Sequence, residues 1–206
     1  KRFDYTEFRE AKIFAEFSSP VEKMMRTSRV ILELIKNKPN SQMILLTARS
    51  DFDDRDLFLD TFTRFQFDVS LTHVYRAGNI SSHAPTYENK REVLRRLVDL
   101  HRANGGEIDS IRFFDDGEKN LQAIYDESMQ LGVKSVSTYL VDERGDTTVW
   151  KQSADDDLFN VARAIVESFE MYGPENRDFV SIVQEQFNSS HERRDGSSPS
   201  GFGGAV

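Results

Sequence analysis

Hydrophobic positions along the chain form two alternating patterns, one typical of amphipathic helices and one typical of buried strands. Stretches with apolar residues three and four positions apart are separated by short runs that are apolar almost throughout. A short run of this kind suits a strand covered on both faces in a parallel sheet. We predict helices that begin near Pro20, Asp53, Tyr87, Gly117 and Asp155. We predict strands over residues 43–46, 71–75, 111–114 and 135–141, with a short edge strand over residues 147–150.

Helices and strands that alternate at this spacing predict an α/β fold, Rossmann-like, with a mostly parallel sheet flanked by helices. The predicted core covers residues 20–152 and follows an aromatic-rich segment over residues 1–19. From Asp155 the pattern is helical only, so residues 153–188 are expected to form two helices appended to the core. Residues 189–206 are rich in Gly and Ser and have little to bury, so we expect a flexible tail.

Composition excludes several classes of site and partner. The 206 residues include 27 Lys and Arg against 35 Asp and Glu, and this acidic balance argues against a dedicated duplex-binding protein. The absence of cysteine excludes disulfides, thiolate zinc sites and cysteine nucleophiles. The longest apolar runs are far too short to span a bilayer, so we expect no membrane partner and a cytoplasmic location, in the host cell if the gene is viral.

Polar residues that follow the predicted strands are the candidates for chemistry, because open parallel sheets bind ligands at the carboxyl ends of their strands. Thr47 follows the first strand, while Asp115 and Asp116 follow the third. Lys90 lies early in the helix that leads into that third strand. Carboxylates hold a hard cation, lysine neutralises phosphoryl charge, and a hydroxyl donates to a phosphoryl oxygen. Together these residues predict a phosphate and Mg²⁺ site.

Each candidate also has a simpler interpretation. Thr47 could bond a loop at the end of its strand, and the two aspartates could cap the following helix. Lys119 lies just after the acidic pair and competes with Lys90 for the same role.

Several arginines give the helix that carries Lys90 a basic face, at Arg91, Arg95, Arg96 and Arg102. A basic face can follow a nucleic-acid backbone. Acidic residues at helical spacing, Glu88, Glu92 and Asp99, instead favour ion pairs on a solvated helix face.

Three short stretches resemble motifs of the haloacid dehalogenase (HAD) superfamily in order and spacing. Leu45-Leu46-Thr47-Ala48-Arg49 is similar to its second motif, Lys90 to its third, and Phe113-Phe114-Asp115-Asp116 to its fourth. Asn120-Leu121 adds to the likeness. Within the superfamily, the chain most resembles the phosphatase modules of phage polynucleotide kinases and the small phage phosphatases.

The resemblance implies a HAD-like core and a Mg²⁺-dependent phosphohydrolase. The implied substrate is a phosphomonoester, with a nucleotide or a polynucleotide end as candidates. Under the resemblance, Thr47 binds the phosphoryl group and Lys90 stabilises the charged intermediate. Asp115 ligates Mg²⁺, and Asp116 is a second or supporting carboxylate.

The first motif of that superfamily, an apolar strand ending in Asp-x-Asp, has no counterpart here. Only Arg2-Phe3-Asp4-Tyr5-Thr6 comes near it, and threonine stands where the second aspartate belongs. Asp51, Asp53 and Asp54 cluster beyond Thr47, but they fall where a helix begins and are expected to cap it. We therefore expect the nucleophile strand upstream of Lys1.

The alternative is a catalytically degenerate relative, a binding or structural protein such as a phage virion or assembly component. A protein partner would then contact the N-terminal segment or the two C-terminal helices.

Overall fold

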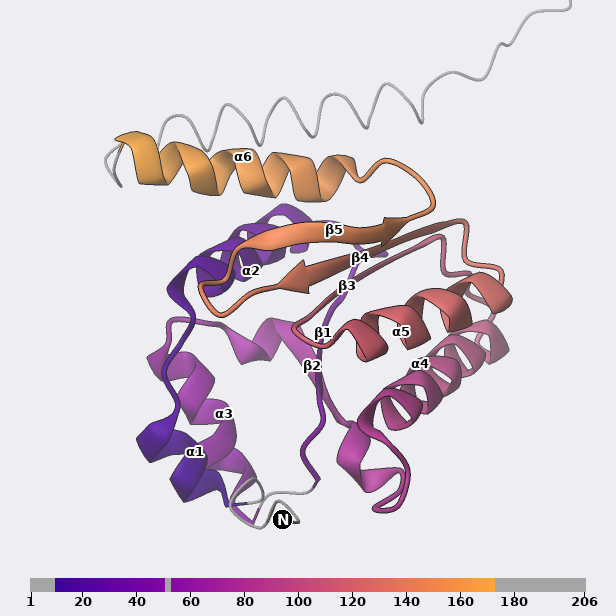
Figure 1. Ribbon diagram of the computed structural model, residues 1–206, viewed down its shortest axis with the longest axis horizontal. Helices are drawn as coiled ribbons and strands as arrows, with labels where there is room; N and C mark the ends of the chain where they lie inside the picture. The colour runs from indigo at the N-terminus through magenta and orange to yellow at the C-terminus, as the bar shows by residue number, and fades with distance from the viewer. Residues whose placement is uncertain (1–9, 51–52, 173–206) are drawn as a thin grey trace, which may run out of the picture. The chain divides into compact units, whose positions relative to one another are not determined.

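The computed structural model describes residues 10–50 and 53–172, over which helices and strands alternate as predicted (Figure 1). The chain divides into two compact units, Lys1–Asp156 and Asp157–Val206. The helices are α1 (Ala11–Phe17), α2 (Glu22–Ile35), α3 (Arg55–Arg64), α4 (Thr86–Ala103), α5 (Glu118–Gln130) and α6 (Asp157–Tyr172), with short 3-10 turns at η2 (Val69–Leu71) and η3 (Ala77–Asn79). The strands are β1 (Met43–Thr47), β2 (Thr72–Arg76), β3 (Ser110–Asp115), β4 (Ser135–Val141) and β5 (Thr147–Gln152). The α/β class is confirmed.

The strands form two sheets rather than the single sheet that the sequence predicted. β1 and β2 are parallel, with Met43 opposite Thr72. β3 and β4 are also parallel, and β5 joins β4 as an antiparallel edge strand. The sheet orders are therefore β1-β2 and β3-β4-β5, because no strand in the described part of the chain joins β1 to β3.

The expectation that β1 is covered on both faces is wrong for the same reason. None of its side chains is fully buried, and Ile44 is 38% exposed. β4 has a partner on each side, and its Val136 and Tyr139 are 0% and 1% exposed. Among the strands described, fully buried apolar side chains occur on β4, which is paired on both edges, and on none of the others.

Helix boundaries follow local chemistry in part. Asp54 caps α3 as predicted, since its side chain accepts from Leu57 N at 2.9 Å. α2 begins at Glu22, two residues after the predicted position near Pro20, and its N-cap Val21 offers no side-chain acceptor. After α4, Gly105 adopts a φ of 80°, the left-handed conformation that glycine permits at a helix end.

The described part of the aromatic-rich opening packs on α3 through α1. The ring of Phe14 lies 4.9 Å from that of Phe58 on α3, and Phe58 lies 5.2 Å from Phe62. Asp53 adds a polar contact by accepting from Ala11 N at 2.9 Å. Residues 1–9 of the predicted segment lie outside the described residues.

The described part of the second unit is α6. Its buried apolar residues recur at helical spacing, as at Leu158, Ala162 and Ile165. The second predicted helix of the appendage and the predicted tail lie outside the described residues. None of the helices in the described ranges is long and apolar enough to cross a membrane.

A buried tyrosine links β4 to the end of the first unit. Tyr139 donates to Asp156 Oδ2 at 2.7 Å, and Arg112 Nε donates to Asp156 Oδ1 at 2.6 Å. The ring of Phe114 stacks on Tyr139 with centroids 4.7 Å apart. Burial, together with the Asp156 carboxylate, raises the pKa of Tyr139 well above its ordinary value.

This raised pKa predicts a loss of stability in alkali. Above about pH 10 the unfolded chain releases the phenol proton while the folded protein retains it, so the free energy of unfolding falls as the pH rises. Urea unfolding across this range measures the slope, which we expect to be smaller in Tyr139→Phe. Tyr125→Phe is the control, because Tyr125 is only half-buried, and it should retain the wild-type slope. Equal slopes in the wild type and Tyr139→Phe would contradict the assignment.

Candidate active site at the carboxyl end of β3

The carboxyl end of β3 and the first turns of α4 meet in a buried ion pair. Lys90 Nζ donates to Asp115 Oδ2 at 2.5 Å across 25 residues of sequence. Lys90 is 7% exposed and Asp115 is 9% exposed. The lysine nitrogen also lies 5.7 Å from the centroid of the Phe113 ring. Two of the four residues predicted for the site are therefore in direct contact.

The second oxygen of Asp115 is fixed by the turn that begins α5. Asp115 Oδ1 accepts from Gly117 N at 2.8 Å and from Asn120 Nδ2 at 2.8 Å. A Cβ atom at Gly117 would lie 2.9 Å from Asn120 Nδ2 and 3.1 Å from Asp115 Oδ1, so glycine permits this close approach. Asp115 Oδ1 therefore fixes the turn before α5, while Asp115 Oδ2 binds the Lys90 ammonium group.

The neighbouring charged residues lie outside this buried contact. Asp116 follows Asp115 directly and is exposed to solvent. Lys119 is also exposed, so Lys90 is the lysine that the fold brings to Asp115.

Thr47 lies at the end of β1, on the other sheet. Its Oγ1 accepts from Arg49 N at 3.2 Å, and the residue is half-buried. No hydrogen bond connects Thr47 with Lys90 or Asp115 in the described part of the chain. In this structure Thr47 therefore makes the contact that the simpler interpretation predicted, a hydrogen bond with the loop that follows β1.

The segment after Thr47 is held by the turn that leads towards α4. Gly78 in η3 donates from its N to Arg49 O at 3.2 Å. A Cβ atom at Gly78 would lie 2.6 Å from Ala48 O and 2.7 Å from Ser50 N, so a larger residue would push the two segments apart. The Arg49 guanidinium lies 4.6 Å from the centroid of the Phe14 ring, and its burial lowers the pKa of Arg49. This packing connects the end of β1 with the segment that leads to Lys90.

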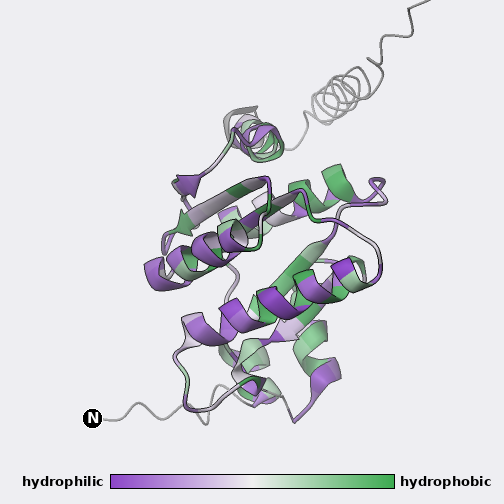
Figure 2. Cartoon of the chain, turned by 90° about the vertical axis from the view of Figure 1, so that its right-hand side faces the viewer, coloured by the Kyte–Doolittle hydropathy of each residue, from purple (hydrophilic) through white to green (hydrophobic). Residues whose placement is uncertain are grey.

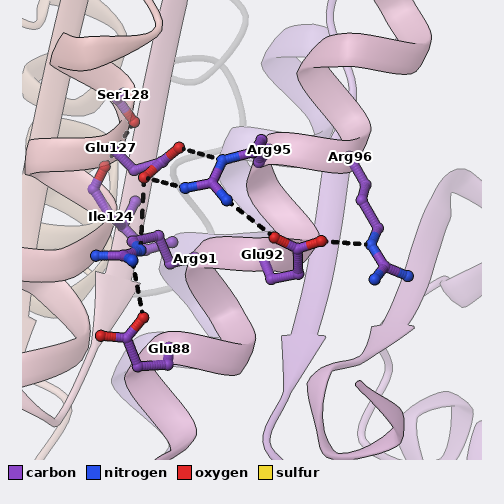
Figure 3. A network of polar contacts seen from close by, with 8 residues as sticks. All are labelled: Glu88, Arg91, Glu92, Arg95, Arg96, Ile124, Glu127 and Ser128. Carbon is purple, nitrogen blue, oxygen red and sulfur yellow. Dashed lines mark hydrogen bonds and ion pairs between the residues drawn. The ribbon is translucent and has the colours of Figure 1, made fainter. Parts of the chain in front are cut away.

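Three of the four arginines on the basic face of α4 form ion pairs (Figure 3). Glu127 on α5 is 3% exposed and accepts from Arg95 Nε at 2.8 Å and from Arg95 Nη2 at 3.0 Å. Arg91 Nε lies 3.5 Å from the same carboxylate. Within α4, the remaining pairs are Glu88 with Arg91, Glu92 with Arg95, and Glu92 with Arg96.

These pairs support the ion-paired interpretation of the helix over the nucleic-acid one. The hydrogen bond from Arg96 lowers the pKa of Glu92, and the bonds to Glu127 raise the pKa of Arg95. α4 and α5, nearest the viewer in Figure 2, show both hydrophilic and hydrophobic residues along their length. Because Arg91 follows Lys90 directly, the contact with Glu127 also fixes the rotation of α4 that directs Lys90 to β3.

The side chains at this site that could bind Mg²⁺ are two adjacent carboxylates. Mg²⁺ in proteins commonly takes one or two carboxylates and completes its shell with water and phosphate oxygens. Asp115 and Asp116 would supply such a pair. No group of three or more acidic or histidine side chains suited to a metal occurs within the residues described.

The other acidic residues near Thr47 have structural contacts. Asp54 caps α3, and Asp53 binds the backbone of Ala11, whose N–H lowers the pKa of the Asp53 carboxyl. Asp4 and Asp51 lie outside the described residues. Sequence reasoning overlooked the role of Asn120 as a donor to Asp115, although its position five residues after the aspartate could have suggested a contact across the turn.

Comparison with known proteins gives a partial likeness. No family model matches the chain, and no solved structure matches it. ATP synthase subunit delta from Mesoplasma florum is 30% identical over 80 residues, which cover 37% of this chain and 42% of the relative. The chain therefore spans less than half the length of that curated relative.

Lys90→Met should destabilise the protein strongly. The substitution keeps a long apolar stem but leaves the buried Asp115 carboxylate without its cation, which costs about 3–5 kcal/mol in the free energy of unfolding. Lys119→Met is the matched control and should change that free energy by less than about 0.5 kcal/mol, because Lys119 is exposed. Urea denaturation measures both, and equal effects would show that the ion pair is not buried in solution.

Glu127→Gln should weaken the packing of α4 on α5. The amide accepts from Arg95 without a charge, so we expect a loss of about 1.5–3 kcal/mol in the free energy of unfolding. The control is Glu88→Gln, whose side chain is 36% exposed against 4% for Glu127. Chemical denaturation at low and high salt compares the two, and a loss no larger than that of the control would contradict the role of Glu127.

Proposed function

We propose that this chain carries most of the active site of a Mg²⁺-dependent, HAD-type phosphohydrolase acting on a phosphomonoester. The observation that carries the proposal is the buried pair of Lys90 and Asp115 at the carboxyl end of β3. Burying two charges is costly, and a buried pair contributes little net stability against an apolar alternative. A site that must hold a phosphoryl group gives such a pair a function, because a lysine and a carboxylate are both needed there.

Each residue of the proposed site would have a different role. Lys90 would offset the negative charge of the phosphoryl group, and the Thr47 hydroxyl would donate to one of its oxygens. Asp115 and Asp116 would hold Mg²⁺, which when bound polarises the phosphoryl oxygens. Asn120 and Gly117 would keep Asp115 oriented through their two hydrogen bonds.

The nucleophile in this proposal is an aspartate on a strand encoded upstream of Lys1. Its carboxylate attacks phosphorus, the bond to the substrate oxygen breaks, and an aspartyl-phosphate forms. A second aspartate protonates the departing oxygen, and water then hydrolyses the aspartyl-phosphate to inorganic phosphate. Among the described residues β1 and β3 each pair along one edge only, which supports this placement.

A second candidate is a binding or assembly protein on the same scaffold. The partial relative is named as a subunit of an ATP synthase, so it belongs to a larger assembly. Phe17 at the end of α1 is 77% exposed, which favours a protein contact near the N-terminal segment. In that case Lys90 and Asp115 serve the fold alone.

Phosphatase assays on a protein that begins upstream of Lys1 separate the two candidates. We expect Mg²⁺-dependent, EDTA-sensitive release of phosphate from p-nitrophenyl phosphate and from a 3′-phosphorylated oligonucleotide. Asp115→Asn should lower kcat/KM at least about a hundredfold, on the scale of losing one electrostatic contact to the reacting group.

Asp60→Asn is the control, because Asp60 is exposed on α3, and it should retain wild-type activity. The 206-residue chain without the upstream strand should be inactive. Equal activity of Asp115→Asn and the wild type would contradict the site, and no hydrolysis by the longer protein would favour the binding candidate.

A further inference from the structure

Both carboxylate oxygens of Asp115 accept hydrogen bonds from donors of this chain. Oδ1 accepts from Gly117 N and from Asn120 Nδ2, each at 2.8 Å. Oδ2 accepts from Lys90 Nζ at 2.5 Å. A carboxylate has about four lone-pair positions for donors or cations, so these bonds use most of them. Asp115 is therefore largely occupied before any ligand binds.

The donors on the two oxygens differ in how easily they can leave. Gly117 and Asn120 lie two and five residues after Asp115, before α5 and in its first turn, so the local backbone fixes their contacts. Lys90 comes from α4, and its ammonium group ends a flexible four-carbon stem. Rotation of that stem moves the charge while the backbone stays in place. The Lys90 contact is therefore the one that can exchange.

Lys90 and a divalent cation exclude each other at Asp115 Oδ2. Mg²⁺ binds carboxylate oxygens at about 2.0–2.1 Å, which is closer than the Lys90 nitrogen lies. The Lys90 and Asp115 side chains are 8% and 6% exposed, so little water screens two positive charges placed side by side there. One of the two cations must leave when the other binds.

We propose that Lys90 is a substitute cation, which neutralises Asp115 in the free protein and moves to a phosphoryl oxygen when Asp115 binds Mg²⁺. The inference rests on the proposed function for the identity of these two ligands. In the free protein, the pair leaves neither buried charge uncompensated. Once Asp115 binds the metal ion, the Lys90 ammonium group has lost its carboxylate. An anion beside Lys90 restores the balance of charge.

This exchange makes the binding of the two ligands interdependent. The Lys90 ammonium group is buried and lies 5.7 Å from the centroid of the Phe113 ring, which attracts a cation more weakly than a carboxylate does. Displacing Lys90 with Mg²⁺ alone is therefore costly. A phosphoryl group alone is also disfavoured, because it draws Lys90 away and leaves Asp115 without a cation. The two ligands together compensate every charge, so each should raise the affinity for the other.

Binding measurements on the 206-residue chain test this coupling. The Gly117 amide is bonded to Asp115, so its NMR chemical shift reports a titration with Mg²⁺, without and with inorganic phosphate. We expect phosphate to lower the dissociation constant for free Mg²⁺ at least about tenfold, and Mg²⁺ to lower that for phosphate by the same factor. A dissociation constant for Mg²⁺ that phosphate leaves unchanged, or no binding of Mg²⁺ in the presence of phosphate, would overturn the proposal.

Lys90→Met removes the substitute cation and should uncouple the two ligands. Mg²⁺ alone should then bind at least about tenfold more tightly than it binds the wild type, and phosphate should no longer change its affinity. Lys119→Met is the matched control, because Lys119 is exposed, and it should retain the wild-type coupling. An affinity for Mg²⁺ no higher in Lys90→Met than in Lys119→Met would contradict the exchange.

Acetylation of the wild type provides a measurement that does not require Lys90→Met to fold. Lys90 is 7% exposed and should react slowly with acetic anhydride in the free protein. It should react faster in saturating Mg²⁺ and slowly again when phosphate is added, whereas the exposed Lys119 should react at the same rate throughout. Labelling of Lys90 that Mg²⁺ does not change would overturn the proposal.

The outcomes also separate this inference from the proposed function. Coupled binding by the 206-residue chain, with no hydrolysis by the protein that begins upstream of Lys1, contradicts the proposed function alone. Hydrolysis by the longer protein, without coupled binding, contradicts this inference alone.

Discussion

A lysine ammonium and an aspartate carboxylate, both nearly removed from water, must stay paired for the fold to tolerate either of them. Lys90 and Asp115 form such a pair, and neighbouring residues hold both side chains in place. The turn at Gly117 and the amide of Asn120 fix one oxygen of Asp115, which leaves the other for the lysine. On the opposite side, Glu127 fixes α4 through Arg95. Contacts at the start of α5 and along α4 therefore fix both side chains of the pair.

Most of the arginine charge on α4 is paired with glutamates, which limits the positive charge that this helix offers to an anionic ligand. Arg91, Arg95 and Arg96 each contact a glutamate, so their charges are largely neutralised by partners on α4 and α5. Lys90 is the residue of this helix that points to the carboxyl end of a strand. Most of the arginines of α4 pair with glutamates, and Lys90 pairs with a buried aspartate. This arrangement fits a single buried site better than an extended nucleic-acid surface.

The division into two sheets has a direct consequence for the site. Backbone pairing is the interaction that fixes the distance between strands in a sheet, at about 4.8 Å between neighbours. Thr47 and Asp115 belong to sheets that no such pairing connects in the described residues. Their connection runs instead through the packing of η3 against the end of β1 and on into α4. Loop packing positions side chains less strictly than strand pairing does.

Much of the fold and half of the candidate site could be predicted from the sequence, because both depend on local patterns. Apolar periodicity defined the order of helices and strands, and the acidic pair after residues 111–114 identified the end of β3. Family spacing selected Lys90, and the structure brings it to Asp115 across 25 residues. The capping role of Asp54 also followed from its position before a helical stripe.

The tertiary structure alone decided which charges are buried and which strands are paired. Residue chemistry without the motif resemblance could not rank Lys90 above Lys119, because burial depends on the direction that α4 takes over β3. The sequence predicted one sheet from its alternating helices and strands, but pairing requires a neighbouring strand as well as a suitable sequence. The sequence also suggested partners for the arginines within their own helix, but not Glu127, which lies 32 residues beyond Arg95 on another helix and contacts Arg91 and Arg95. Local pattern determines what each segment can form, and long-range packing determines which of its groups remain available for chemistry.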